Sequence, residues 1–275
     1  MTEISDIAWL AVLARGLATA GFVGGVIALM ERSSPFIGGI VLALPIVTAP
    51  AYLFLLLQHD AGFIATAALG SLATIGAVLL FIAVVIGMVR YLPMPAVLAC
   101  ALGTWFLVGL AIRLLPASLP TSLGILAMAA LVAWLAGRNV LLTAPAARSR
   151  SPVFEVVLRG AMAGVLVIGV SLLAELFGPR IAGIFASFPV ALLAVCWFLP
   201  RRLDAAGIRA AMRATQIGMV SHIPFFFSLT LLGPALATQG WPRFTAFGLG
   251  IAGSLLVALT LGLLRRRQMK RVNAV

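Results

Sequence analysis

The sequence predicts an all-α integral membrane protein with about nine transmembrane helices, arranged as two inverted four-helix repeats joined by a linker helix. Three observations predict this fold: the composition, a series of long apolar runs, and a repeat that returns after 144 residues. Of the 275 residues, 63% are hydrophobic and 9% are charged, whereas soluble domains carry roughly 25% charged residues. With a mean hydropathy of +1.19, an ordinary soluble domain is excluded.

The apolar runs are long enough to cross a bilayer, which takes about 20 residues of helix. No stretch between them is long enough to form a soluble domain. Hydropathy places nine spans at about 7–30, 36–57, 62–89, 93–114, 119–137, 153–175, 180–199, 206–232 and 244–264.

The basic residues are distributed unevenly between the two ends of these spans. When Arg15 and Arg159 are set aside because they lie deep within spans, and the N-terminus is placed outside, 14 of the 17 remaining basic residues fall on one side, and only Arg113, Arg180 and Arg243 fall on the other. This positive-inside pattern predicts a multi-pass protein of the bacterial inner (plasma) membrane, with its C-terminus in the cytoplasm. Topology and attraction to anionic lipid explain the net charge of +12, so nucleic acid is not an expected partner.

The repeat aligns residues 12–61 with residues 156–205 without a gap, and 17 of these 50 positions are identical. The motif Pro-x-Ile-x-Gly-Ile-x-x-x-x-Pro occurs whole in both copies, at 35–45 and 179–189. Other informative pairs are Arg15 with Arg159, Gly16 with Gly160, Gly25 with Gly169, Glu31 with Glu175 and Asp60 with Asp204. The pattern indicates an internal duplication.

The two copies are expected to face opposite ways. Equivalent spans are five apart, and because five is odd, equivalent helices should run in opposite directions. The span at 119–137 has no counterpart and links the copies. Inverted repeats of this kind are frequent in secondary transporters. The expected divisions are 1–116 for the first repeat, 117–150 for the linker helix and its cytoplasmic loop, 151–265 for the second repeat and 266–275 for a basic cytoplasmic tail.

Helix-breaking residues occupy the second and seventh spans. Gly39 and Pro45 in one copy match Gly183 and Pro189 in the other. An interior proline removes a hydrogen bond and presses on the preceding turn, so both helices are expected to be kinked or broken. Carbonyls freed inside a membrane are tolerated only against protein or water. The four residues are therefore candidates for a substrate site, and a packing kink beside glycine contacts is the alternative.

Arg15 and Arg159 lie about 10–12 Å into their helices, at about 1.5 Å per residue. A charge at that depth is costly, so each should face the protein interior or a water-filled cavity. Both are candidates for attracting an anionic substrate or head group, with a structural ion pair or a clamp on carbonyls as the alternatives. The acidic pairs are interpreted as interfacial or paired side chains at Glu31 and Glu175, and as helix N-caps at Asp60 and Asp204.

Polar residues gather in the eighth span, in a stretch whose partner in the first copy is nearly apolar. Arg213, Thr215, Ser221 and His222 are candidates for substrate binding. A histidine titrates near neutral pH and can carry a proton, although a structural hydrogen bond is the simpler explanation for a lone one.

No catalytic, metal or cofactor motif has the context that it requires. The glycines at 248, 250 and 253 fit a dinucleotide fingerprint but lie inside a span, with no strand before them. Cys100 and Cys196 lie in separate spans and are interpreted as packing residues. We therefore expect no catalytic residue, no metal and no cofactor, and we do not expect an enzyme.

The second copy has a run of Arg-Ile-Ala-Gly-Ile-Phe-Ala-Ser-Phe-Pro at 180–189, then Arg-Ala-Thr at 213–215 and Ser-His-Ile-Pro-Phe-Phe at 221–226. Over about 150–265 this pattern resembles the GlpM-like family of small bacterial inner-membrane proteins. The resemblance implies a fold in which each family member corresponds to one copy of the repeat, and this chain to a fused pair. It also implies a loose link to exopolysaccharide.

The sequence favours a membrane transporter or flippase-like protein for a small or lipid-linked anion. The expected partners are membrane lipids and an anionic small molecule or head group. The alternative is a non-transporting accessory subunit of an envelope or exopolysaccharide assembly system. A homo-oligomer or a partner from such a system is compatible with these hypotheses.

Overall fold

The computed structural model describes residues 2–32, 44–141, 153–201 and 203–272. Within these ranges the chain is helical throughout, with turns and no strand. The α-helices are α1 (Thr2–Arg32), α3 (Thr48–Gln58), α4 (Ala61–Met88), α5 (Met94–Leu114), α6 (Leu119–Gly137), α7 (Val153–Phe177), α8 (Pro179–Ala186), α9 (Val190–Phe198), α10 (Ala205–Gly218), α11 (His222–Phe227), α12 (Gly233–Thr238) and α13 (Thr245–Val272).

In the described ranges, seven helical segments are long and apolar enough to cross a membrane, and α1 and α3 add shorter apolar stretches. Helices are suited to a lipid bilayer because every backbone hydrogen bond is made within the segment. The chain is therefore a helical, multi-pass membrane protein. The predicted spans 62–89, 93–114, 119–137 and 153–175 agree with α4 to α7 within two residues.

Three segments differ from the predictions: the second span, the tail at 266–275 and the eighth span. The second span is described only from residue 44 onward, and its helix α3 begins after Pro45, at Thr48. The basic tail at 266–275 was expected to follow the last span, yet α13 continues through it to Val272. Its arginine, glutamine, methionine and lysine residues are good helix formers, and nothing in the run Arg265–Val272 breaks a helix.

The eighth span is a longer and less regular helix than expected, continuous over Ala205–Thr238. A 3₁₀ turn at Met219–Ser221 separates α10 from α11, and a π-helical turn at Ser228–Leu232 separates α11 from α12. Each irregular turn shortly precedes a proline, Pro224 or Pro234. A proline leaves the carbonyl four residues earlier without its donor, and a local change of helical pitch accommodates this.

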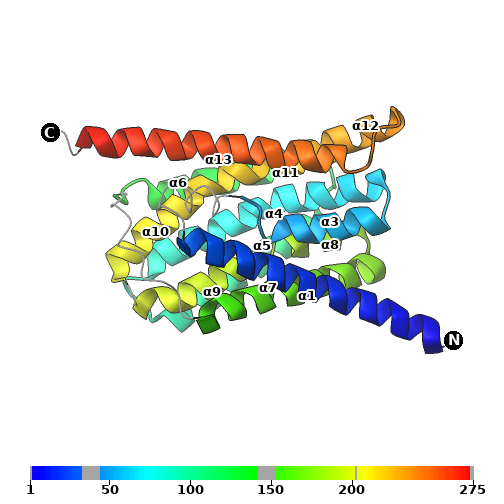
Figure 1. The fold of residues 1–275 in the computed structure, drawn as a ribbon. Helices are drawn as coiled ribbons and strands as arrows, with labels where there is room; N and C mark the ends of the chain where they lie inside the picture. Colours follow the sequence, from blue (N-terminus) through cyan, green and yellow to red (C-terminus); the bar gives the residue numbers. More distant parts are fainter. Residues whose placement is uncertain (1, 33–43, 142–152, 202, 273–275) are drawn as a thin grey trace.

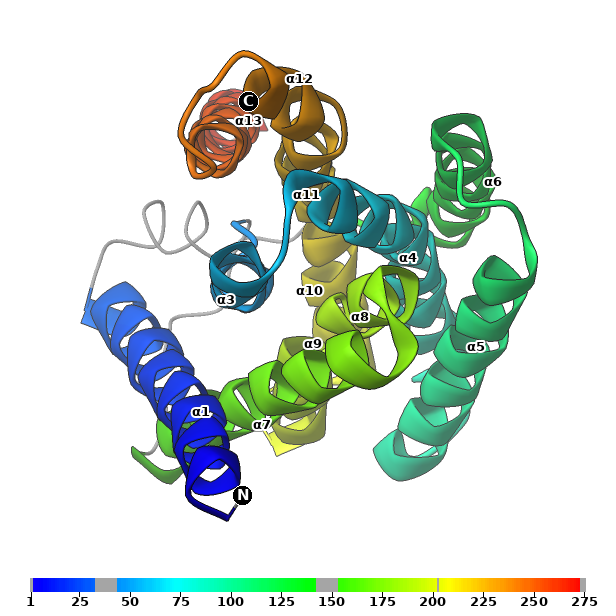
Figure 2. The same ribbon diagram turned by 90° about the vertical axis from the view of Figure 1, so that its right-hand side faces the viewer.

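α4 is the central helix, with 78% of its most apolar stretch buried inside the protein, against 17% for α13. It packs against α5, α6 and α8, and on another side against α10 and α11 (Figure 2). One core cluster includes Tyr52, whose ring meets Phe225 and Phe226 edge-on at centroid separations of 5.7 and 5.6 Å. The buried surface of these helices therefore converges on α4.

α4 and α10, which the predicted repeat matches with each other, run antiparallel. Arg209, near the start of α10, donates to the carbonyl of Ile86, near the end of α4, at 2.9 Å. At the other end, Ile64 of α4 lines the same cleft as Leu229, late in the α10–α12 run. α1 begins at one end of the bundle and α13 ends at the opposite end (Figure 1).

Candidate functional site

α1 and α7 cross with their backbones in close contact. A Cβ atom on Gly160 would lie 2.6 Å from the carbonyl oxygen of Ala20, and one on Gly164 would lie 2.5 Å from that of Gly16. Only glycine permits so close an approach. Position 16 of α1 meets position 164 of α7, and position 20 meets position 160, so the two helices are antiparallel.

These two contacts are reciprocal in the repeat. Position 16 is matched with 160, and position 20 with 164, at the spacing of 144 residues. In the predicted repeat, the contact of Gly16 with Gly164 is therefore the counterpart of the contact of Ala20 with Gly160.

The two candidate arginines beside this crossing have different surroundings. Arg159 forms an ion pair with Glu155, one turn earlier in α7, and the side chains are 14% and 2% exposed. Arg15 is half-buried at the flank of a buried stripe formed by Val12, Gly16, Thr19 and Val23. Its carbonyl accepts the Thr19 hydroxyl at 2.9 Å, and within the described residues its guanidinium has no acidic partner. The structure thus gives Arg159, but not Arg15, the ion pair that the sequence left as an alternative.

The seventh span is interrupted. α8 ends at Ala186 and α9 begins at Val190, with Ser187 to Pro189 between them. The Ser187 N–H turns back to the carbonyl of Ile184 at 3.3 Å, and the Phe188 N–H to that of Phe185 at 2.9 Å. Pro189 is buried and its carbonyl accepts the Leu193 N–H at 2.9 Å, which starts the next helix.

In the first copy, Pro45 is buried and lies just before α3, and its carbonyl accepts the Ala49 N–H at 2.7 Å. Pro189 thus stands immediately before α9, and Pro45 lies three residues before the start of α3 at Thr48. Gly39 lies outside the described residues, so the arrangement around it stays a prediction.

Gly183 lets α8 lie directly on the backbone of α4. A Cβ atom there would overlap the carbonyl of Ala67. The carbonyl of Gly183 accepts the Ser71 hydroxyl at 2.6 Å, and Ser71 in turn lies 2.8 Å from the Tyr52 hydroxyl. Since Ser71 donates its one proton to Gly183, Tyr52 donates to Ser71. This buried chain satisfies a carbonyl at the interrupted end of α8, as a membrane interior requires.

The four candidates of the eighth span lie along α10 and α11 rather than at one point. Arg213 donates to the side-chain oxygen of Gln216 and packs over Gly137, where a Cβ atom would lie 2.8 Å from the Arg213 Cδ. The hydroxyls of Thr215 and Ser221 donate hydrogen bonds to carbonyls about one turn earlier in the chain, those of Ala211 and Gly218. These bonds give both hydroxyls local structural partners.

Two buried nitrogen atoms in this stretch have no hydrogen-bond partner among the described residues: Nδ1 of His222 and Nε2 of Gln216. The structure therefore does not supply the bond that the sequence offered as the simpler explanation of His222. α10 and α11 pack against α4 and α13, whereas α1 packs against α7. The predicted residues thus do not meet at one point: Arg15 and Arg159 lie beside the α1–α7 crossing, Gly183 and Pro189 lie in and after α8, and the polar residues of the eighth span lie along α10–α11.

Three arginines have a role that sequence reasoning missed. Arg180 donates to the carbonyls of Ile112 and Leu115 at the end of α5. Arg209 bonds the carbonyl of Ile86 near the end of α4, and Arg243 that of Leu56 near the end of α3, at 3.2 Å. Last-turn carbonyls lack donors of their own and carry the negative end of the helix dipole, so a cation there is stabilising.

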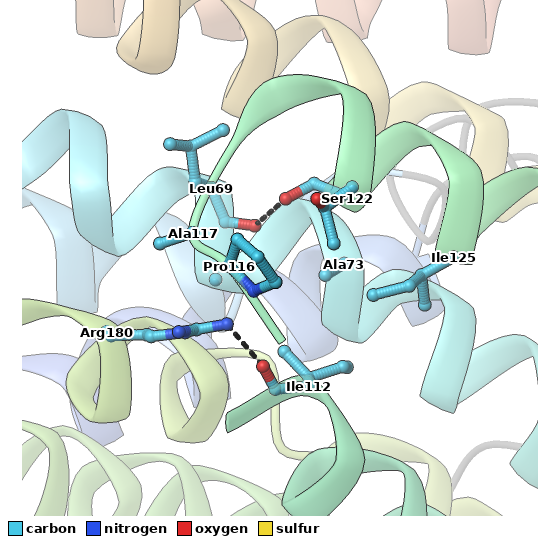
Figure 3. Close-up of a pocket in the computed structure, with 10 residues that line it drawn as sticks. Leu69, Ala73, Ile112, Pro116, Ala117, Ser122, Ile125 and Arg180 are labelled. Atoms are coloured by element: carbon cyan, nitrogen blue, oxygen red, sulfur yellow. Dashed lines mark hydrogen bonds between the residues drawn. The ribbon is translucent and has the colours of Figure 1, made fainter. Parts of the chain in front are cut away.

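Around Arg180, the structure leaves a small pocket between α4, α8 and the connection from α5 to α6 (Figure 3). Its volume of about 10 Å³ gives room for about one water molecule. Ser122 closes it on one side by donating to the carbonyl of Leu69 at 3.1 Å. The pocket is therefore a packing space, too small for an organic ligand.

The two acidic N-caps are confirmed. Asp60 accepts the Phe63 N–H and Asp204 the Gly207 N–H, both at 2.8 Å. Glu175 is exposed near the end of α7, and its charge partly offsets the lowering of the pKa of His59 by burial. Glu155 was missed, although a carboxylate four residues before an arginine in a helix is a local signal of a pair.

In the described part of the chain, no group of three or more histidine, cysteine, aspartate or glutamate side chains is placed to hold a metal ion. Comparison with known proteins found no matching family model, no matching curated protein and no matching solved structure. The resemblance to the GlpM-like family therefore stays a prediction from the motifs of the second copy.

Proposed function

We propose that the protein is a membrane transporter or flippase-like protein for a small or lipid-linked anion. The observation that carries this proposal is the reciprocal, antiparallel crossing of α1 and α7 at Gly16, Ala20, Gly160 and Gly164. A two-fold axis in the membrane plane would generate this pairing from two inverted copies. Such an axis is a common basis for alternating access, in which the two copies rock against each other about a site near the midplane.

The antiparallel packing of α4 against α10 supports the same inversion. The interruption between α8 and α9 supports a discontinuous helix of the kind that forms transporter sites. The distribution of basic residues supports a cytoplasmic C-terminus in a bacterial inner membrane.

Arg15 is the residue that we assign to the anion. It lies beside the crossing, it is half-buried, and within the described residues it has no acidic partner. A buried arginine in a membrane protein faces the interior and seeks a counter-charge. Arg159 has that counter-charge in Glu155, so we assign it a structural role.

The test is flux of phosphorylated and carboxylated anions into vesicles that contain the purified protein. Loss of a charge-assisted hydrogen bond lowers transport by about ten-fold or more, so Arg15→Ala should be impaired by this amount and Arg15→Lys less. Arg138→Ala is the matched control, because Arg138 is exposed at the end of α6 over the ring of Trp134. A folded Arg15→Ala protein with parental flux would refute the assignment of Arg15. A folded parent without flux that co-purifies with one stoichiometric membrane partner would favour the accessory role.

A further inference from the structure

A cleft of about 520 Å³ opens where the two halves of the chain meet at one end of the bundle. One wall is the turn from α3 to α4 and the other is the turn from α12 to α13, and Figure 1 places both turns at the same end. The volume is within the range of about 300–1,000 Å³ that small-molecule sites occupy. The cleft is separate from Arg15 and from the pocket at Arg180.

The inner part of the cleft is apolar. Ile64 of α4, Leu229 of the π-helical turn and Ala246 of α13 are buried there, at 2%, 1% and 3% exposure. Leu56 and Leu236 extend this surface toward the rim. An apolar surface of this shape suits a hydrocarbon chain, which gains free energy from every buried methylene group.

The rim of the cleft is polar and contains Asp60, Trp241 and Arg243, all of them exposed. One guanidinium nitrogen of Arg243 is bonded to the carbonyl of Leu56, which fixes the side chain and leaves its other N–H groups for a ligand. Tryptophan is frequent at this level in membrane proteins, because its ring sits among lipid head groups.

His59 lies in the same wall. Its ring stacks on Phe63 at a centroid separation of 3.7 Å, and its Nε2 atom has no partner among the described residues. Burial lowers the pKa of His59, and Glu175 and Asp60 only partly oppose this. The ring is therefore a neutral, fixed part of the wall, with its Nε2 atom covered by the protein.

We propose that this cleft binds a phosphate-bearing membrane lipid, with the phosphate at Arg243 and one acyl chain along Ile64, Leu229 and Leu236. An apolar floor below a rim with a fixed arginine matches the two parts of such a lipid. The proposal does not depend on transport, since a lipid can occupy the cleft whether or not it is carried.

The first test uses vesicles in which an anionic phospholipid carries a diazirine in its acyl chain. After irradiation, peptide mapping should locate the label on residues of the cleft. Gly233→Leu should fill the cleft with little strain, because the nearest atom to an added Cβ is that of Ala246 at 3.9 Å, and should lower the cleft labelling about ten-fold. Gly124→Leu is the matched control, because an added Cβ at this exposed position on α6 meets nothing within 4 Å.

The second test addresses the phosphate. Arg243→Gln keeps a polar side chain but removes the charge. It should lower labelling by the phospholipid about ten-fold, the loss expected for one charge-assisted bond, and leave labelling by a diazirine-bearing diacylglycerol unchanged. Arg113→Gln, on an exposed arginine at the end of α5, should change neither.

Labelling that avoids the cleft peptides, or that survives Gly233→Leu, would overturn the proposal. Equal loss of both probes in Arg243→Gln would overturn the phosphate assignment. These results are independent of the flux assay. Cleft labelling without flux would support the lipid site and refute transport. Flux without cleft labelling would support transport and refute the lipid site.

Discussion

Asp60 in the first half of the chain and Asp204 in the second half do the same thing: each caps the helix that follows it, at the same distance of 2.8 Å. Gly16 and Gly160 likewise both lie in the α1–α7 crossing. Arg15 and Arg159 are matched just as well in the sequence, yet only Arg159 has an acidic partner among the described residues.

The difference comes from one position. Glu155 stands four residues before Arg159, whereas the matched position before Arg15 is Ala11. Residues that set backbone geometry, such as caps and glycines at close approaches, have kept their roles in both halves. Side-chain chemistry differs between them: Arg159 is in an ion pair with Glu155, and Arg15 is the residue that we propose binds the anion.

The largest expected effect is that of removing Glu155. Breaking one partner of a buried ion pair costs about 3–5 kcal/mol, because the other charge stays buried. Glu155→Ala should therefore lower the thermal unfolding temperature in detergent far more than Glu175→Ala, whose side chain is exposed. If the two variants unfold at the same temperature, Glu155 does not anchor Arg159.

Replacing glycines of α1 and α7 by alanine should lower the unfolding free energy by smaller and graded amounts. Gly160→Ala places a methyl group against the backbone of Ala20 and should cost about 1–3 kcal/mol of unfolding free energy. Gly16→Ala should cost less, because the nearest atoms belong to the movable side chain of Ile168, and Gly169→Ala least, because nothing lies within 4 Å. An equal loss of thermal stability in all three would contradict the reciprocal crossing.

A third change would make the two halves alike. Ala11→Glu gives Arg15 a carboxylate one turn away, as Glu155 gives Arg159. If Arg15 binds the anion, flux should fall about ten-fold, equivalent to about 1.4 kcal/mol, and the neutral Ala11→Gln should leave flux near the parental rate. Unchanged flux in a folded Ala11→Glu protein would remove Arg15 from the site.

The smallest expected effect tests the roles that the halves share. Asp60→Ala and Asp204→Ala should each cost about 1 kcal/mol of unfolding free energy, the usual value of an N-cap. Asn at either position should restore most of it, because its side-chain oxygen also caps. A much larger loss at one of the two positions would indicate an added role there.

The features that sequence analysis predicted are those with local signals. Long apolar runs located α4 to α7 within two residues, and the N-caps followed from an aspartate before each helix. The position of Pro189 marked where α8 and α9 separate. The helical extension of α13 through the basic tail was not predicted, although the helix propensity of its residues is a local signal.

Features with distant partners had no such signal. Arg180, Arg209 and Arg243 bond carbonyls 68, 123 and 187 residues away in the sequence. A carbonyl has the same chemistry in every residue, so no residue type marks it as a partner. The chain from Tyr52 through Ser71 to Gly183 likewise depends on how α8 lies on α4.

The inversion of the two halves is the central claim, and matched single cysteines test it most directly. Gly62 and Ala206 are matched at the spacing of 144 residues, and both are exposed just after a helix N-cap. In a protein with Cys100→Ser and Cys196→Ala, a membrane-impermeant maleimide should label Gly62→Cys in intact spheroplasts and Ala206→Cys only after lysis. Labelling of both cysteines from the same side of the membrane would contradict the inverted arrangement.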